Sequence, residues 1–426
     1  MIRTIARYGA RHVPGSMVAA LKAIARGEGL RGPYVQQFEK RFAEYQSMRH
    51  AISASYGRMA FYYILKALEL ASGSEIIFPA LTFWVVPEMA RVSGFRPVFA
   101  DIDPSTFNLD PAKFEAAITS KTSAVVPTHL YGQPCDMDPI MRIARAHKLA
   151  VIEDCAHALG ATYKGQKVGT FGDASFFSFQ MLKPLNTYGG GMAVTNDRTV
   201  AARIRALAEA QEWPAAKGVF KKILLGNLQR KLVGPYGFTF TMFLAFYIAS
   251  FFGDYDLSRY LWESIRPLSP LPESYRKRYT NAQALIGLRM LENIDKFNAL
   301  NRAHAAKLTA ALRDIDGIQP PASPPETEPV YYQYCIRAAE PDILKHRAIR
   351  AGVDVEIMHV DICNVLDVFQ EFKTECPVAE ATQHTLQLPV YASLTERDLN
   401  RLINVIRQAV RRPKPLVRAT DPRSMS

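Results

Sequence analysis

The stretch Val151–Ala158, VIEDCAHA, joins the end of an apolar strand to two carboxylates and a histidine. Residues Ala150–Ile152 predict a buried strand, and Asp154 follows at the carboxyl end of that strand. In α/β proteins, ligands bind in the crevice outside the carboxyl ends of the strands. Asp154 therefore lies where chemistry is expected. Acidic residues at strand ends also cap helices, so both roles stay open for this position.

Four more strand-like segments precede this stretch, and helix-like segments alternate with them. They are Ile52–Ser55, Ile76–Phe78, Val98–Ala100 and Ala124–Val126. The alternation predicts an α/β fold in which a mixed, mostly parallel sheet lies between two layers of helices. With 426 residues, 48% of them hydrophobic, the chain is long enough for about two or three domains.

The second half of the sequence predicts a smaller α/β domain. Helices are expected at Arg198–Ala210, Ala282–Phe297, Arg302–Asp314, Pro341–Ala351 and Thr395–Arg411, after earlier ones at Val13–Gly27 and Tyr34–Tyr45. A proline-rich linker is expected at Pro320–Pro329 and a strand at Val330–Ile336. We therefore predict a large domain over residues 1–290, a small C-terminal domain over residues 291–412 and a disordered tail over residues 413–426.

The five cysteines show neither disulfide spacing nor metal-ligand spacing. They are Cys135, Cys155, Cys335, Cys363 and Cys376. An odd number without a paired pattern favours a reducing cytoplasm and indicates no zinc or other metal site. The first residues, MIRTIARYGARHVPG, lack the uninterrupted apolar core of a signal peptide, so no export is expected. We expect a cytoplasmic protein.

The formal net charge of +12 favours an anionic partner. No acidic residue occurs from Trp213 to Gly253, and this region is rich in basic residues. These are Lys217, Lys221, Lys222, Arg230 and Lys231. The sequence contains no zinc finger, no aromatic RNA-binding signature and no convincing helix-turn-helix pattern. A nucleic-acid partner is therefore not expected, which leaves a phosphorylated small molecule or an acidic membrane surface.

The segment Leu232–Gly253, LVGPYGFTFTMFLAFYIASFFG, has no formal charge. It reaches the length of a membrane span, but its dense apolar part of about sixteen residues suits a core or interfacial segment better. The stretch before it, GVFKKILLGNLQRKL, repeats apolar residues at helical spacing beside lysines, as interfacial helices do. The residues on this predicted face are Phe220, Ile223, Leu224 and Leu228. Three interpretations of residues 213–268 stay open: contact with a membrane surface, a buried dimer or core element, and a true span.

The run Ser178–Gly191, SFQMLKPLNTYGGG, places one lysine, Lys183, in an uncharged stretch that ends in three glycines. Taken alone, such a lysine is more typical of a surface loop, with its ammonium in water. Upstream, Ser53–Ala60, SASYGRMA, leads from a strand into a helix, and a helix N-terminus with free amides can bind phosphate. One candidate constellation combines this phosphate cradle with Asp154, with His157 three positions farther on, and with Lys183.

Several blocks, in order along the chain, resemble the DegT-type nucleotide-sugar aminotransferase family of fold-type-I pyridoxal-phosphate enzymes. The blocks are VFADIDPSTFNLDP, VVPTHLYGQPCDMDPI, VIEDCAHALGATYKGQKVGTFGDASFFSF, GGGMAVTND and LQLPVYASLTERDLNRLI. The resemblance covers residues 13–410 and implies the fold-type-I fold, with pyridoxal 5'-phosphate as cofactor. It also implies a homodimer in which each active site is completed by the other subunit.

The resemblance implies a role for each residue around the coenzyme ring. Lys183 would form the Schiff base with pyridoxal phosphate and then act as general base and acid between substrate and coenzyme. Asp154 would pair with the pyridine nitrogen, so that the ring can accept electrons. His157 would lie near the ring hydroxyl, and Phe83 would stack on the ring.

The phosphate side departs from the family pattern. The resemblance implies that Ser178 and the amides of Gly57 and Arg58 hold the phosphate, although Arg58 stands where a threonine usually follows the glycine. Its guanidinium could add a charged donor. Arg276 occupies the place of an asparagine that, in the family, reaches the coenzyme phosphate from the partner subunit.

The implied reaction passes an amino group from an amino acid, usually glutamate in this family, to a keto sugar carried on a nucleotide. The amino sugar would serve polysaccharide, lipopolysaccharide or glycoconjugate biosynthesis. Residues 212–270 form an insertion where relatives have a shorter loop, so a lipid-linked or non-sugar carbonyl substrate stays open. A noncatalytic, membrane-associated scaffold is the alternative from another class. Lys183 disfavours a related sugar dehydratase, because that branch lacks the lysine.

Overall fold

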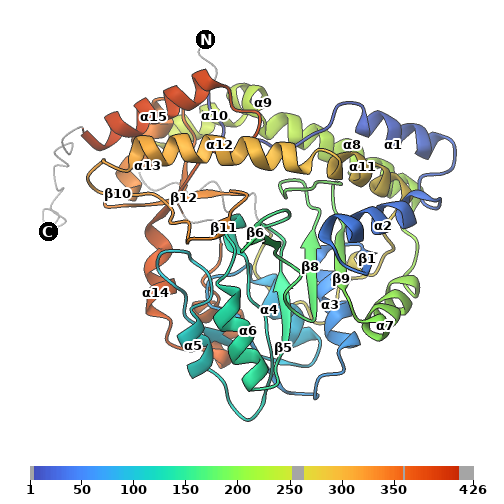
Figure 1. Cartoon of the computed structure of the whole chain (residues 1–426). Helices are drawn as coiled ribbons and strands as arrows, with labels where there is room; N and C mark the ends of the chain where they lie inside the picture. The colour runs from blue at the N-terminus through green and yellow to red at the C-terminus, as the bar shows by residue number, and fades with distance from the viewer. Residues whose placement is uncertain (1–3, 252–262, 358–359, 412–426) are drawn as a thin grey trace, which may run out of the picture.

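A computed structural model places a seven-stranded sheet in the protein and describes residues 4–251, 263–357 and 360–411 (Figure 1). The strands are β1 (His50–Ala54), β2 (Glu75–Pro79), β3 (Arg96–Ala100), β4 (Thr122–Val125), β5 (Ala150–Asp154), β8 (Ala174–Ser178) and β9 (Gly191–Thr195). Their order is β1-β9-β8-β5-β4-β2-β3. Strands β3, β2, β4, β5 and β8 run parallel, whereas β9 pairs antiparallel with β8 and β1. The predicted mixed, mostly parallel sheet is confirmed.

Helices cover both faces of this sheet, because neighbouring residues of a strand point to opposite faces. Ile77 and Val125 join one core with α5 and α6, whereas Ile76 and Ala124 join another with α3 and α4. The helices of the first half are α1 (Ser16–Ala25), α2 (Tyr34–Gln46), α3 (Gly57–Ala67), α4 (Val85–Val92), α5 (Pro111–Ala116), α6 (Met137–Ala146) and α7 (Arg198–Glu209). Buried apolar residues on both sides explain why the strands appear in the sequence as near-continuous apolar runs.

The next two helices differ from the sequence prediction. The structure has α11 (Asn281–Leu291) and α12 (Ile294–Leu312), so the chain breaks near Asn293 and not after Phe297. At the predicted break, Asn298 and Asn301 donate their amides to loop carbonyls of Leu159, Val330 and Tyr331. These asparagines are therefore satisfied by neighbouring loops within a continuous helix.

A four-stranded antiparallel sheet forms the C-terminal part of the structure. Its strands are β10 (Ile318–Gln319), β12 (Tyr334–Ala338), β14 (Thr385–Leu388) and β13 (Glu356–Ile357), in that order. The helices α13 (Pro341–Arg350) and α15 (Glu396–Arg411) match the prediction, and α14 (Pro377–Glu380) is an addition. The strand expected at Val330–Ile336 begins only at Tyr334. The short 3-10 helices are η1 (Leu130–Gly132), η3 (Glu273–Tyr275), η4 (Cys363–Val365), η5 (Asp367–Phe372) and η6 (Ala381–His384).

Two segments connect the cores of the molecule. Figure 1 shows the long helix α12 extending across it, and Ile294 at its start lies in a different core from Leu308 near its end. The expected linker Pro320–Pro329 contains strand β11 (Thr327–Glu328), which pairs with β6 (Thr162–Tyr163); β6 also pairs with β7 (Gln166–Lys167). The division of the chain at residue 290 stays a prediction, and the tail 413–426 lies outside the described residues.

Within residues 212–270, the predicted insertion, the described part contains three helices, α8 (Ala216–Val233), α9 (Pro235–Phe240) and α10 (Met242–Ala249). Among the described residues, no helix combines the length and the apolar character needed to cross a membrane. The predicted single apolar face on α8 is wrong in one residue. Ile223 is fully buried in the core, whereas Phe220, Leu224 and Leu228 are exposed. Ile223 thus attaches α8 to the body of the protein, and the other three residues form part of its outer side.

Candidate active site

A cavity of about 370 Å³ lies at the carboxyl ends of the strands, where the sequence predicted the site. Seven of the eight predicted site residues line it: Gly57, Arg58, Phe83, Asp154, His157, Ser178 and Lys183. They come from the end of β5, the end of β8, the start of α3 and the loops that follow the strands. Arg276 is the exception. It is exposed, directly follows η3 and does not line this cavity.

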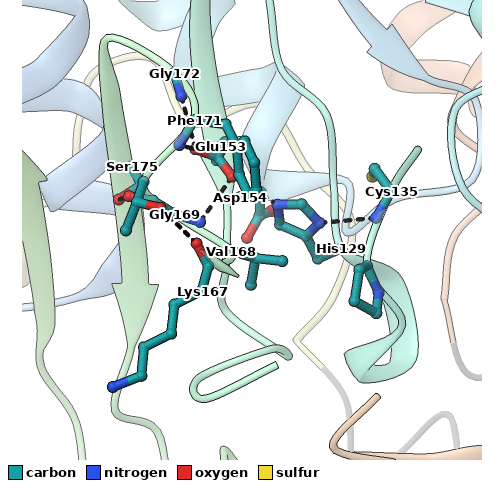
Figure 2. A network of polar contacts seen from close by, with 12 residues as sticks. His129, Cys135, Glu153, Asp154, Lys167, Val168, Gly169, Phe171, Gly172 and Ser175 are labelled. Atoms are coloured by element: carbon teal, nitrogen blue, oxygen red, sulfur yellow. Dashed lines mark hydrogen bonds and ion pairs between the residues drawn. The ribbon is translucent and has the colours of Figure 1, made fainter. Parts of the chain in front are cut away.

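The two adjacent carboxylates of β5 serve different purposes, because they point to opposite faces of the strand. Glu153 is buried and accepts hydrogen bonds from the amides of Gly169, Phe171 and Gly172 at 2.7–2.8 Å. His129 Nε2 lies 3.0 Å from the same carboxylate (Figure 2). Glu153 is therefore a structural residue that fixes the loop between β5 and β8.

Asp154 faces the cavity and is also buried. Burial raises its pKa above the ordinary value of an aspartate, while the amide of Ala156, 2.9 Å away, and the charge of Lys183 oppose that rise. The carboxylate accepts a hydrogen bond from an amide two residues farther along the chain. It retains capacity for a further hydrogen-bond donor in the cavity. This arrangement suits a carboxylate that holds a protonated ring nitrogen.

Lys183 follows β8 in a loop that is closed by its own backbone. The carbonyl of Phe179 accepts hydrogen bonds from the amides of Thr187 and Gly189 at 3.1 and 3.0 Å. Burial lowers the pKa of Lys183, an effect that the charge of Asp154 opposes. Lys183 is half-buried, and an amine with a lowered pKa is a better nucleophile than a surface lysine, because more of it is neutral. The surface-lysine interpretation is therefore not supported.

His157 holds the amine of Lys183. Its Nε2 lies 2.7 Å from Lys183 Nζ, its Nδ1 lies 3.4 Å from the amide nitrogen of Tyr131, and its ring stacks on Tyr332 at 4.3 Å. The amide can only donate, so the network assigns Nδ1 as acceptor and places the ring proton on Nε2. That proton points to the lone pair of a neutral amine at Lys183.

The start of α3 forms an anion cradle. The first amides of a helix have no acceptor within the helix, and no side chain caps this one. A Cβ at Gly57 would lie 2.8 Å from Cβ of Ser178, and a Cβ at Gly191 would lie 2.5 Å from Gly57 Cα. Only glycine fits at these two positions, and their close packing brings Ser178 next to the helix start.

The guanidinium of Arg58 is engaged by the insertion. It donates to both carboxylate oxygens of Glu263, at 2.9 and 2.7 Å, and to the hydroxyl of Tyr275 at 2.5 Å. It also lies 5.9 Å from the centre of the Phe83 ring. The side chain of Arg58 is thus held at the cavity wall by a partner from residues 212–270, which the sequence pattern did not indicate.

Sequence analysis missed further residues that line the cavity, among them Gln229, Glu263 and Tyr332. Tyr332 comes from the aromatic run YYQY, and its ring centre lies 5.0 Å from Lys183 Nζ. The alternation of aromatics was a signal for this residue, but it was interpreted only as a strand. Gln229 and Glu263 lie within residues 212–270 and carry no local motif.

A half-buried amine, a buried carboxylate and a helix start at the strand ends of a mixed α/β sheet form the arrangement expected of a fold-type-I aminotransferase. A model of the DegT/DnrJ/EryC1/StrS aminotransferase family matches residues 15–230 and 258–407. The chain therefore belongs to the DegT/DnrJ/EryC1/StrS aminotransferase family. The match leaves out residues 231–257, which contain α9 and α10.

Individual relatives agree with this assignment. GDP-perosamine synthase of Caulobacter vibrioides is 32% identical over 89% of this chain and 91% of its own length. UDP-N-acetyl-3-dehydro-alpha-D-glucosamine 3-aminotransferase of Acidithiobacillus ferrooxidans is 30% identical over 87% of each chain. The solved structure of DesV from S. venezuelae, in complex with a ketimine intermediate, is 27% identical, has a TM-score of 0.74 and covers 93% of this chain and 95% of its own.

Proposed function

We propose that this protein is a pyridoxal-phosphate-dependent aminotransferase that converts a nucleotide-linked keto sugar into an amino sugar. The observation that carries the proposal is the half-buried amine of Lys183, whose Nζ lies 2.7 Å from His157 Nε2 and whose pKa responds to the charge of Asp154. The named relatives act on GDP- and UDP-linked sugars, which supports a nucleotide-linked substrate. A noncatalytic scaffold would have no need of this arrangement.

The cavity fits pyridoxal phosphate in size and chemistry. The amides at the start of α3 and the hydroxyl of Ser178 would hold the phosphate. Phe83 lines the cavity and remains partly exposed, so it can stack on the ring, while Asp154 would keep the ring nitrogen protonated. When bound, the coenzyme supplies an aldehyde that carries the amino group and a ring that draws electrons from the substrate carbon.

Lys183 has two tasks in this proposal. It holds the coenzyme covalently at rest, and it then moves a proton at the reacting carbon. Both tasks need a neutral amine, which burial favours. His157 contacts Nζ of Lys183 directly, so it orients the amine toward the cavity. Its stacking on Tyr332 fixes the plane of the imidazole.

The remaining parts of the proposal concern the donor and the assembly. We infer that glutamate supplies the amino group and that the product serves polysaccharide or glycoconjugate biosynthesis, as the family resemblance implies. We also infer a homodimer. The exposed position of Arg276 outside the cavity of its own chain supports a contact with the coenzyme phosphate of the partner subunit.

Borohydride reduction tests the cofactor proposal. The full chain is incubated with pyridoxal phosphate, reduced and digested, and the modified peptide is identified by mass spectrometry. We expect the coenzyme on Lys183 and a visible absorbance band that Lys183→Arg removes. Lys222 is the internal comparison, because burial lowers its pKa to about 8 but it does not line the cavity. Modification of Lys222 alone, or none at all, would overturn the assignment.

A panel of substrates tests whether the keto sugar is nucleotide-linked. GDP-, UDP- and TDP-linked keto sugars and the corresponding free keto sugars are offered with glutamate, and 2-oxoglutarate formation is measured. We expect turnover of at least one nucleotide-linked sugar and little turnover of the free sugars. Equal turnover of free and nucleotide-linked sugars would contradict the proposed substrate class, whereas it would leave the coenzyme assignment intact.

A further inference from the structure

The outer side of the insertion is apolar and exposed. Ten large apolar residues between 220 and 251 are 40% to 73% exposed: Phe220, Leu224, Leu225, Leu228, Leu232, Tyr236, Phe240, Leu244, Ile248 and Phe251. Eight of them recur at every fourth position from Phe220 to Ile248. We call these ten residues the insertion face. Single exposed apolar residues are common, but a run of this length marks an interaction surface.

The insertion is docked on the protein by its inner side. Val219 and Ile223 are buried in a core cluster that also contains Tyr188. At Gly226 a Cβ would lie 2.6 Å from the Tyr188 ring, so the helix packs closely there. Farther along, the hydroxyl of Thr239 accepts a hydrogen bond from the amide of Thr4 at 3.1 Å. These contacts fix α8 and α9 and leave their other side outward.

The charged residues of α8 are all positive, and α9 and α10 carry none. Lys217, Lys221 and Lys231 are exposed on α8, and the sequence from Trp213 to Gly253 has no acidic residue. At 100° per residue, these lysines fall on the same half of α8 as Phe220, Leu224, Leu225, Leu228 and Leu232. A partner must therefore offer apolar contacts together with negative charge.

We propose that the insertion face lies on the surface of an anionic lipid bilayer. A bilayer surface provides both components at once, because acyl chains accept the apolar residues while lysine stems extend to the headgroups. A second copy of the chain meets this requirement poorly. A two-fold axis through α8 would bring Lys217, Lys221 and Lys231 near their own copies, with no acidic residue from Trp213 to Gly253 to pair them.

The helices are suited to lying on a membrane. Gly234 and Thr241 separate α8, α9 and α10, so the apolar run is divided into short pieces. Among the described residues, no helix meets the length and hydropathy of a span. The family match also leaves out residues 231–257, so α9 and α10 are additions to the common fold of the family.

Docking would bring the active-site cavity close to the bilayer. Gln229 of α8 and Glu263 line the cavity, and the same helix carries five residues of the insertion face on the side next to Gln229. One helix with its side chains is about 10–12 Å thick. The cavity would thus lie about one helix diameter from the headgroups, where substrates held at the membrane surface are concentrated. The docking itself is independent of the proposed reaction.

Vesicle sedimentation tests the proposal with the full-length protein. Vesicles of phosphatidylcholine alone are compared with vesicles that contain phosphatidylglycerol. We expect binding to the anionic vesicles that falls with added salt. The double variant Leu224→Ser/Leu228→Ser should bind at least about tenfold more weakly, because two apolar side chains leave the bilayer. The matched control is Leu300→Ser, which changes an exposed leucine of α12 and should have no effect.

Charge reversal provides a second, independent arm. The triple change of Lys217, Lys221 and Lys231 to glutamate should also weaken binding to anionic vesicles at least about tenfold. The control changes three exposed lysines elsewhere, Lys113, Lys121 and Lys296, to glutamate and keeps the same net charge. Equal loss in both triple variants would mean that only net charge matters and would overturn the docking surface.

Two further measurements keep the outcomes distinct. Thermal melting shows whether each variant is folded, and sedimentation velocity without lipid gives its mass. The proposal is supported if the wild type binds vesicles and if Leu224→Ser/Leu228→Ser has the same mass in solution as the wild type. The proposal is overturned if the wild type does not bind vesicles. It is also overturned if the double variant dissociates into smaller species, because the insertion face would then contact a second copy of this chain. Turnover of a substrate free in solution should be the same in the double variant and wild type.

Discussion

Side chains at the strand ends around Asp154 and on the outer side of α8–α10 differ in their exposure to solvent in opposite ways. At the strand ends, polar and charged groups are withdrawn from solvent and contact one another, as the half-buried Lys183 and the buried His157 do. On α8–α10, large apolar side chains such as Phe240 are exposed. We infer from this difference that the strand ends hold the reacting groups and that the outer side of α8–α10 contacts a partner outside the chain. Changes in the two regions should therefore have separable effects.

Lys183→Ala should produce the largest separation. Because the lysine both holds the coenzyme and moves the proton, we expect turnover to fall by about 10⁴-fold or more. Binding to anionic vesicles should not change, since Lys183 lies in the cavity and not on the insertion face. Single-turnover assays and vesicle sedimentation on the same preparation check both statements. A parallel loss of vesicle binding would mean that the two regions are coupled.

Asp154→Asn should have a smaller but still large effect. An asparagine keeps the shape and loses the charge that would hold a protonated ring nitrogen, so we expect turnover to fall by about 10²–10³-fold. Coenzyme binding should fall much less, because the phosphate cradle is untouched. Titration with pyridoxal phosphate, followed by absorbance, separates the two quantities. Equal losses in binding and turnover would point to a structural role for this carboxylate.

Glu153→Gln sharpens the contrast between the two carboxylates of β5. Glu153 accepts hydrogen bonds from three backbone amides, and a glutamine amide cannot accept all of them. Each buried donor without an acceptor costs about 1–3 kcal/mol, so we expect a loss of about 2–5 kcal/mol in the free energy of unfolding. Chemical denaturation measures it, with the exposed Glu115→Gln as control. Asp154→Asn should destabilise far less than this variant.

Much of the site was predictable because each residue follows a strand. Apolar runs bounded by polar residues defined the strands, and the rule for α/β crevices placed Asp154 and the helix start at Gly57 at one edge of the sheet. The same local sequence singled out His157 and Lys183. The family resemblance added Ser178 and gave each residue its expected role.

The errors arise where the outcome depends on what covers a segment. Periodicity placed Ile223 and Phe220 on one helical face, but only tertiary packing shows that the first is covered and the second is not. Glu263 reaches Arg58 from 205 positions away, and no local pattern reports such a pair. For the same reason, the sequence prediction ended one helix at Phe297 and began the next at Arg302, where the structure has the continuous helix α12.

The pH dependence of coenzyme capture tests the electrostatics of the strand ends. Only the neutral amine of Lys183 reacts with an aldehyde, and burial lowers its pKa below that of an exposed lysine. Capture by coenzyme-free protein should therefore rise about tenfold per pH unit up to a midpoint below the ordinary value of 10.5. Because the charge of Asp154 raises the pKa of Lys183, Asp154→Asn should move the midpoint lower still. Stopped-flow absorbance gives both midpoints. A higher midpoint in Asp154→Asn would contradict the electrostatic effect of Asp154 on Lys183.

The pair Arg58–Glu263 is the place where the two regions meet, and it carries the smallest expected effect. Glu263 belongs to the insertion but points its carboxylate at a guanidinium on the cavity wall. Glu263→Gln removes a negative charge from that wall and leaves Arg58 free to attract anionic groups, so KM for a nucleotide-linked substrate should fall about 2–5-fold. The control is Glu212→Gln, which breaks an exposed pair with Lys277 outside the cavity. A higher KM would instead mean that Glu263 positions Arg58 for the substrate, and the insertion would then be part of the active site as well as a surface beside it.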